Sequence, residues 1–86
     1  MANVFALEIV TPDKTFYNGN AEMIVVRTTE GDRGILKNHR PLVAGLATGT
    51  LLIKLDGKFK DAKVSGGFMN VDKEKTVIVT ESAEWI

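Results

Sequence analysis

Cysteine is absent from the 86 residues, histidine occurs once, and neither sign of charge predominates. Without cysteine the chain can form neither a disulfide nor a thiolate metal site, a composition that fits a reducing compartment. The single imidazole, His39, is too few for a zinc site, which needs three or four nitrogen or sulfur ligands. Eleven basic residues balance eleven acidic ones, so the basic excess typical of nucleic-acid-binding proteins is missing. We therefore expect no metal, no cofactor and no nucleic-acid partner.

Long apolar runs are missing as well. No stretch of about eighteen apolar residues is present, so we expect no direct insertion into a membrane. The segment Met1–Phe5 enters a strand pattern at once, without the basic or Arg-rich start of a targeting sequence. This start favours a protein that works where it is made.

The motifs of common enzymes do not occur. The chain has neither a G-x-S-x-G elbow nor a G-x-x-x-x-G-K-[ST] nucleotide loop. Glu30 and Asp32 could act as a general acid/base pair, but the neighbouring Arg33 and the turn setting favour a solvated loop. We therefore predict that the chain is not an enzyme by itself.

What is present is a series of short apolar runs separated by turn residues. Leu51, Ile53 and Leu55 alternate with other residues and lead into Asp56-Gly57, a strong hairpin signal. No helix of about ten residues or more, the usual length in globular proteins, is indicated. About nine or ten short strands predict an all-β fold, a two-sheet antiparallel β-sandwich. Its predicted core consists of Phe5, Leu7, Ile9, Val25, Leu51, Ile53, Val64, Val77 and Val79.

The segment Glu30–Leu42 is predicted to be a stiff, polar, projecting loop between two strands. Gly31 and Gly34 indicate a tight turn or a bulge, and Pro41 favours an extended conformation at the residue before it. His39, close to this proline, is interpreted as a hydrogen-bonded loop residue in preference to a ligand or a base. Further along, Gly66-Gly67 indicates a bulge or a close approach between strands. Loops of this kind often form contact surfaces.

These elements, in this order, resemble a known family, the N-terminal β-sandwich domain of the epsilon subunit of F-type ATP synthases, called delta in mitochondria. One departure is Lys37-Asn38, where the family commonly has Pro-Gly before the histidine. The matching residues are Leu7–Pro12, Phe16–Gly19, Glu22–Val26, Glu30, Gly31, Gly34, His39, Pro41, Leu42, Gly49, Ser65–Phe68 and Val71.

The resemblance implies a non-catalytic subunit of the central stalk. It would dock the gamma subunit onto the membrane rotor ring, alongside other ATP synthase subunits, and couple proton or sodium flow to ATP synthesis. Its place would be peripheral, on the cytoplasmic face of the bacterial inner membrane. By analogy with the family, Glu30, Gly31, Asp32 and Arg33 contact the ring. Residues Thr11, His39, Arg40, Val43 and Thr50 face gamma.

Full-length members of the family continue into a pair of C-terminal helices, which this sequence does not contain. Residues 1–82 are predicted to form the sandwich and residues 83–86 to start a linker to such a region. Residues 81–84 also look compatible with a helix. An excised domain, a naturally short subunit and a chain whose helical part was omitted all fit this pattern. Trp85 is predicted to pack on the sandwich edge or to belong to the linker.

A free-standing ligand-binding β-sandwich, such as a carbohydrate or peptide module, is the competing interpretation. Such modules usually expose an aromatic platform. This chain has one Trp, one Tyr and four Phe, most of them at positions predicted to face inward.

Overall fold

The computed structural model describes residues 4–86, so the predicted strand start at residues 1–3 lies outside the described part. The described chain is all-β, as predicted, and it has no helix that could cross a membrane. The strands are β1 (Phe5–Val10), β2 (Thr15–Ala21), β3 (Met23–Thr28), β4 (Gly31–Leu36), β5 (Leu42–Leu46), β6 (Gly49–Leu55), β7 (Lys58–Val64), β8 (Gly67–Val71), β9 (Lys75–Thr80) and β10 (Ala83–Trp85).

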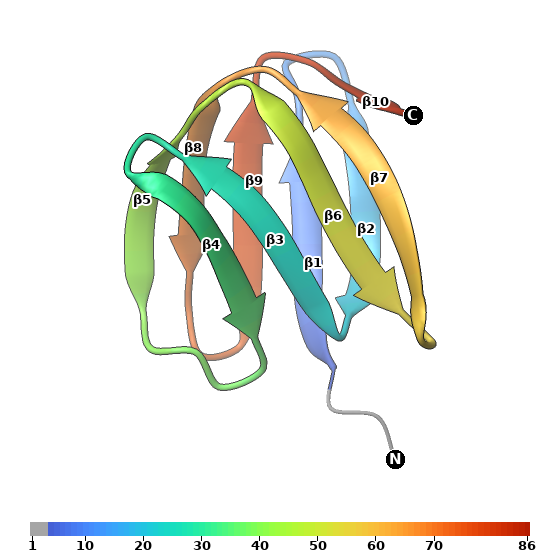
Figure 1. The fold of residues 1–86 in the computed structure, drawn as a ribbon, viewed down its shortest axis with the longest axis vertical. Helices are drawn as coiled ribbons and strands as arrows, with labels where there is room; N and C mark the ends of the chain where they lie inside the picture. The colour runs from blue at the N-terminus through green and yellow to red at the C-terminus, as the bar shows by residue number, and fades with distance from the viewer. Residues whose placement is uncertain (1–3) are drawn as a thin grey trace.

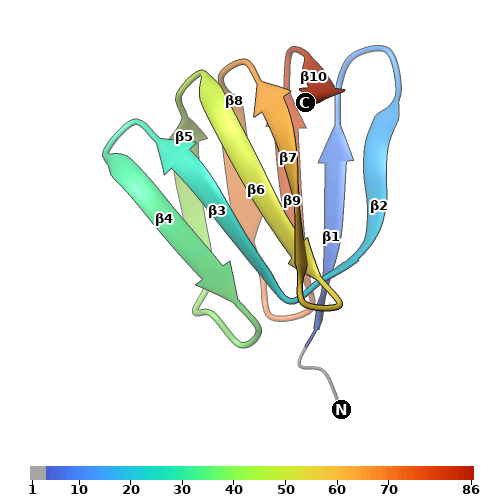
Figure 2. The same cartoon turned by 45° about the vertical axis from the view of Figure 1, so that its right-hand side comes forward.

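The strands form two layers packed face to face, which confirms the sandwich (Figures 1 and 2). One layer runs β4-β3-β6-β7-β10 and the other runs β5-β8-β9-β1-β2. β3 and β5 join the two layers, with Thr28 opposite Leu46. Two backbone hydrogen bonds flank this pair, from the Thr29 N–H to the Gly45 carbonyl and from the Ala47 N–H to the Arg27 carbonyl. The sandwich is therefore closed on the β3–β5 side, while its end strands β2 and β10 do not pair with each other.

The prediction of a purely antiparallel sandwich is wrong in one place. β1 and β9 pair in parallel, with Ala6 opposite Lys75 and Val10 opposite Val79, while the other strand pairs are antiparallel. Parallel neighbours need a long crossover connection, and here the connection comprises the seven strands β2 to β8, which belong to both layers. Strands that pair over such a distance leave no turn signal between them in the sequence.

The hairpin predicted at Asp56-Gly57 is confirmed. It joins β6 to β7, and both residues have positive φ, 55° for Asp56 and 75° for Gly57. Two successive residues with positive φ are the mark of a type I′ turn, whose twist matches that of the flanking strands.

The predicted core is partly confirmed. Leu7, Ile9, Leu51, Ile53 and Val64 are buried between the layers.

For β3 and β9 the predicted inward face is wrong. Ile24 and Val26 point inward in β3, and Thr76, Ile78 and Thr80 do so in β9, while Val25, Val77 and Val79 are only half-buried. Phe5 is also half-buried and packs against the core. In both strands apolar residues occur on both faces, so alternation alone does not indicate which face is inside.

The interpretation of residues 81–84 as helix-compatible is wrong, because Ala83–Trp85 forms the edge strand β10. Ala83 lies opposite Val64 and Trp85 opposite Ala62 of β7. A partner strand decides the conformation of a short segment more strongly than its own propensity does. That residues 83–86 lead into a helical region stays a prediction.

Trp85 occupies the edge position, one of the two predicted for it. Its ring centroid lies 4.5 Å from that of Phe16 and 6.1 Å from that of Tyr17, both on β2 of the other layer. The Lys60 ammonium lies 4.2 Å from the Trp85 ring centroid, a cation–π contact. Burial raises the pKa of the Tyr17 phenol, which donates a hydrogen bond to the Asn20 carbonyl. This aromatic cluster covers the side of the sandwich where the layers do not pair.

Candidate functional site

The residues predicted to contact the ring lie on the hairpin between β3 and β4. Only Thr29 and Glu30 form its turn, since the chain from Gly31 onward is a regular strand paired with β3. The predicted long projecting loop is therefore shorter than expected. The buried Thr28 hydroxyl accepts a hydrogen bond from the Glu30 backbone N–H (3.1 Å) and donates one to the Gly31 carbonyl (2.6 Å). Gly31 has a φ of 113°, which favours glycine, so the turn has a defined shape.

The hairpin carries two exposed ion pairs, and Thr28, Thr29, Glu30 and Arg33 line a small depression of about 120 Å³ against β5. Arg27 Nε lies 3.4 Å from Asp32 Oδ1 across the strands, and Arg33 Nη2 lies 4.0 Å from Glu30 Oε1. Exposed pairs of this kind contribute little to stability. No group of three or more Asp, Glu or His within residues 4–86 could hold a metal ion. The arrangement suits a polar contact surface better than an active site.

Gly34 lies within β4, opposite Val25, and not in a turn. An added Cβ there would be 3.1 Å from the methyl carbon of Met23. Glycine at this position lets the Met23 side chain lie flat across β4.

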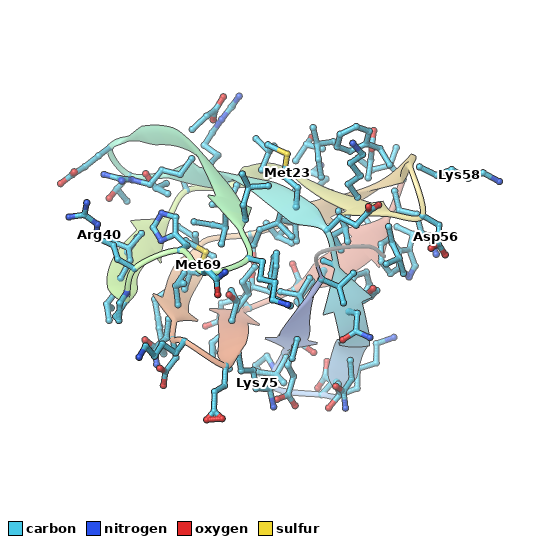
Figure 3. All side chains as sticks on the ribbon, turned by 90° about the horizontal axis from the view of Figure 1, so that it is seen from below. Met23, Arg40, Asp56, Lys58, Met69 and Lys75 are labelled. Carbon is cyan, nitrogen blue, oxygen red and sulfur yellow. The ribbon has the colours of Figure 1, made fainter. Side chains whose placement is uncertain are left out.

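The actual loop in this part of the chain connects β4 to β5 and contains His39, Arg40 and Pro41. Asn38 has a φ of 67°, and the His39 backbone N–H donates to the Leu36 carbonyl over 3.2 Å. His39 Nδ1 lies 2.7 Å from the Arg40 carbonyl oxygen. The histidine is thus a hydrogen-bonded loop residue, the interpretation that the sequence favoured. Seen from below, Arg40 extends outward from this loop (Figure 3).

The residues predicted to face gamma do not form one continuous patch. The β1–β2 turn with Thr11 and the start of β6 with Thr50 lie at the end of the sandwich that also carries the β3–β4 hairpin (Figure 1). The β4–β5 loop with His39 and Arg40 lies at the opposite end. Val43, on β5, is 71% exposed on the outer face of the second layer.

That outer face holds an apolar surface that the sequence did not reveal. Phe68 lies opposite Gly45 of β5 and Val79 of β9, and Val79 lies opposite Val10 of β1. Phe68 is 49% exposed although its strand, β8, lies between β5 and β9. This apolar surface is bordered by charged residues, where Lys75 Nζ lies 2.7 Å from Glu8 Oε1. We call this surface the outer apolar face; its apolar residues are Val10, Val43, Phe68, Val77 and Val79, and the exposed Asn70 lies between Val43 and Val77.

A groove of about 350 Å³ lies at one end of the outer apolar face. The groove is lined by residues of β1, the β1–β2 turn, β8 and β9 and by the residue after β9, namely Val10, Thr11, Pro12, Gly67, Phe68, Val79, Thr80 and Glu81. Glu81 is the one charged residue among those that line it. The groove therefore joins a residue predicted to contact gamma, Thr11, to an apolar face.

Gly67 determines how closely β8 approaches β9 beside this groove. Its φ is 147°, and an added Cβ would lie 1.9 Å from the Val79 carbonyl oxygen. At Gly66 the corresponding distance is 3.1 Å, to the Leu46 carbonyl oxygen. The strands can lie this close only because position 67 has no side chain.

The other layer also exposes one aromatic side chain on its outer face. Phe59 on β7 is 53% exposed. Its surroundings are more charged, because Lys54 and Lys60 lie nearby and Asp61 lines the same depression. This face is less uniformly apolar than the outer apolar face.

A protein-family comparison matches all of the described residues. The family described as ATP synthase, Delta/Epsilon chain, beta-sandwich domain, matches residues 4–86. The ATP synthase epsilon chain of Alkaliphilus oremlandii is 52% identical over 85 residues, which are 99% of this chain and 63% of that protein. The sodium-ion-specific ATP synthase epsilon chain of Propionigenium modestum is 46% identical over 79 residues, 92% of this chain and 58% of that protein. The chain thus spans less than two thirds of the length of these relatives.

Solved structures agree with the fold. A chain in the Euglena gracilis mitochondrial ATP synthase, OSCP/F1/c-ring, superposes with a TM-score of 0.91 at 29% identity, over 96% of this chain and 54% of that one. A chain of the Tetrahymena thermophila mitochondrial ATP synthase central stalk and c-ring has a TM-score of 0.79 at 20% identity, over 93% of this chain and 65% of that one. This second likeness supports the fold alone.

Proposed function

Since the chain belongs to the family of delta and epsilon chains of ATP synthase, as its β-sandwich domain, we propose that it acts as a non-catalytic subunit of the central stalk. In this role it docks the gamma subunit onto the rotor ring and couples proton or sodium flow to ATP synthesis. The observation that carries the proposal is the family match over residues 4–86.

The outer apolar face supports a protein partner for this domain. Apolar side chains in adjacent strands, including a half-exposed phenylalanine, leave a hydrophobic surface in water unless a partner covers it. We assign this face to gamma, together with Thr11 and Val43 of the predicted contact residues. His39, Arg40 and Thr50 would then contact gamma only if it reaches around the sandwich. As part of the complex, the domain would be peripheral at the cytoplasmic face of the bacterial inner membrane.

A free-standing ligand-binding module is less well supported. The aromatic side chains of Phe16, Tyr17 and Trp85 pack against one another at the open side of the sandwich. The expectation that most aromatic residues face inward is wrong, because Phe59 and Phe68 are about half exposed and Trp85 is 39% exposed. Phe59 and Phe68 lie singly on the outer faces of different layers, so they do not form one aromatic platform on which a sugar would stack.

Gel filtration with purified gamma subunit tests the proposed role directly. The complete chain and gamma are expected to elute together as a stoichiometric complex, because the exposed apolar face becomes buried on association. Maltose-binding protein in place of gamma serves as the control for non-specific adhesion. Separate elution of chain and gamma would contradict the proposal.

The ring contact predicts a specific cross-link from the β3–β4 hairpin. In the assembled enzyme, Asp32→Cys is expected to cross-link to a cysteine in a polar loop of the ring. The substitution itself is expected to change the free energy of unfolding by less than about 1 kcal/mol, because the Arg27–Asp32 pair is exposed.

The matched control is Lys73→Cys, an exposed residue in the β8–β9 turn at the opposite end of the sandwich (Figure 1). It is expected to give no cross-link to the ring. Equal cross-linking from both positions, or cross-linking of position 32 only to the catalytic head, would refute the hairpin assignment.

A further inference from the structure

We propose that strand β10 is a strap that closes the unpaired side of the sandwich and detaches as a unit while the rest of the domain stays folded. The inference goes beyond the proposed function and does not depend on it. β10 and β2 are the end strands of the two layers and do not pair with each other. Side-chain contacts between β10 and β2 therefore hold this side of the sandwich closed.

A bulge in β2 brings two aromatic rings to β10. Consecutive residues of a regular strand point to opposite faces of the sheet. Phe16 and Tyr17 are consecutive, yet both rings lie near the Trp85 ring, with centroid distances of 4.5 and 6.1 Å. The pairing of β2 with β1 explains this arrangement, because its register shifts by one residue at this point and leaves Phe16 opposite no residue of β1. Bulges redirect side chains, and this bulge directs both rings at Trp85.

Backbone hydrogen bonds attach both ends of β10. At one end the Ile86 N–H donates to the Asp61 carbonyl of β7 over 3.0 Å. At the other end the Ser65 N–H, just after β7, donates to the Ser82 carbonyl over 3.1 Å. These two bonds flank the ladder between β10 and β7. Because Ser65 and Ile86 are far apart in the sequence, their two amides report independently on whether the whole strand is attached.

Little of β10 is buried. Ala83 is half-buried, Glu84 is exposed and Trp85 is 39% exposed, while β3, β6 and β9 each contain two or more buried residues. The buried members of the core cluster include no residue of β10. Segments with few buried apolar contacts open locally at a lower free energy than the whole domain. β10 can therefore leave β7 without disruption of the core.

Detachment of β10 would bare two features that it covers. β7 would become an edge strand with a row of unpaired N–H and C=O groups, the usual template for pairing with another chain. The Phe16 and Tyr17 rings would lose the Trp85 ring, and Lys60 would lose its cation–π contact with Trp85. β10 therefore protects the β7 edge, and its opening sets how often that edge is available.

Hydrogen exchange of the complete chain, measured for each amide by NMR, tests the inference. After correction for intrinsic rates, the Ser65 and Ile86 amides are expected to exchange at least about tenfold faster than the hydrogen-bonded amides between β3 and β6, because they need only local opening. The two amides are expected to agree within about threefold, because one opening releases both.

Three results would overturn the proposal. Exchange at Ser65 and Ile86 as slow as in β3 and β6 would mean that β10 opens only with global unfolding. Protection at Ser65 without protection at Ile86 would mean that the chain end frays and that β10 does not move as a unit. Absence of protection at both amides would mean that β10 is not closed in solution.

Two half-buried phenylalanines of the same β1–β2 hairpin make a matched pair of variants. Phe16 packs on Trp85, whereas Phe5 lies at the opposite end of the hairpin, opposite Ala21. Phe16→Ala is expected to speed exchange at both reporter amides about tenfold, through loss of the aromatic pair and its buried area. Phe5→Ala is expected to change these rates less than about twofold, because distant sites act independently.

Trp85 supplies a second readout, since it is the single tryptophan of the chain. Its fluorescence emission is expected to shift to longer wavelength in Phe16→Ala and to stay unchanged in Phe5→Ala, and circular dichroism checks that both variants fold. Equal acceleration of exchange by the two variants, with no difference in emission, would mean that the contact between Phe16 and Trp85 does not hold β10. If Phe16→Ala does not fold, exchange in the unsubstituted chain still decides whether β10 opens as a unit.

Discussion

Replacement of Gly67 by alanine is expected to lower the free energy of unfolding by about 2–6 kcal/mol, the sum of a strained backbone and an overpacked contact. The added methyl would lie 1.9 Å from the Val79 carbonyl oxygen, which belongs to the backbone of β9 and cannot rotate away. A chain of this length has a total stability of roughly 4–13 kcal/mol. Urea unfolding followed by circular dichroism should therefore show a folded fraction that is sharply reduced or absent.

Gly31→Ala is the matched control for this experiment. Gly31 also has a positive φ, 113°, but an added Cβ there meets no atom within 4 Å. Gly31→Ala is expected to lower the free energy of unfolding only through backbone strain, by about 1–3 kcal/mol. If Gly67→Ala costs no more than Gly31→Ala, the close approach of β8 and β9 is not present in solution.

Ile53→Ala is expected to destabilise the domain by about 2–5 kcal/mol, the usual cost of a cavity in a well-packed core. Ile53 is 2% exposed and lies in β6, near the middle of its layer. Equilibrium denaturation in urea measures the loss, and an unchanged m-value would show that the unfolded state is unaffected.

The neighbouring residue supplies the control for register. Leu52 points to the outer face and is half-buried, so Leu52→Ala is expected to cost only about 1 kcal/mol. A larger loss at Leu52 than at Ile53 would mean that the inward and outward faces of β6 are exchanged, since a shift of one residue turns every side chain over.

Local signals predicted the parts of the fold that depend on neighbouring residues. Alternation located β1 and β6, and Asp56-Gly57 located the hairpin between β6 and β7, because the turn residues themselves adopt the required positive φ. The strand character of Gly31–Leu36 was not predicted, because its glycines and charges are typical of a loop. That segment is a strand because β3 provides a hydrogen-bonding partner along its whole length.

The candidate site depends on pairing between strands that are distant in the sequence, and such pairing leaves no local sequence pattern. The row from Gly45 through Phe68 and Val79 to Val10 crosses strands β5, β8, β9 and β1, which are distant in the sequence. Alternation predicted Val79 in the core, and this is wrong because its strand has apolar residues on both faces, with Ile78 on the inner one. Thr11 was the one predicted contact residue that lines the groove, and it was indicated by resemblance to the family and not by its own chemistry.

The parallel pairing of β1 with β9 has a consequence for the order in which the domain can form. Strand β1 is synthesised before the other strands of the domain, but its hydrogen-bonding partner on one edge begins only at Lys75. At about 5–20 residues per second, the roughly 65 residues from Val10 to Lys75 take about 3–13 s to synthesise. During that time one edge of β1 stays unpaired, although the hairpin with β2 can already form. The layer that carries the outer apolar face is therefore incomplete until β9 has been made, so a nascent chain cannot recruit a partner through this face before nearly all of the domain has been synthesised.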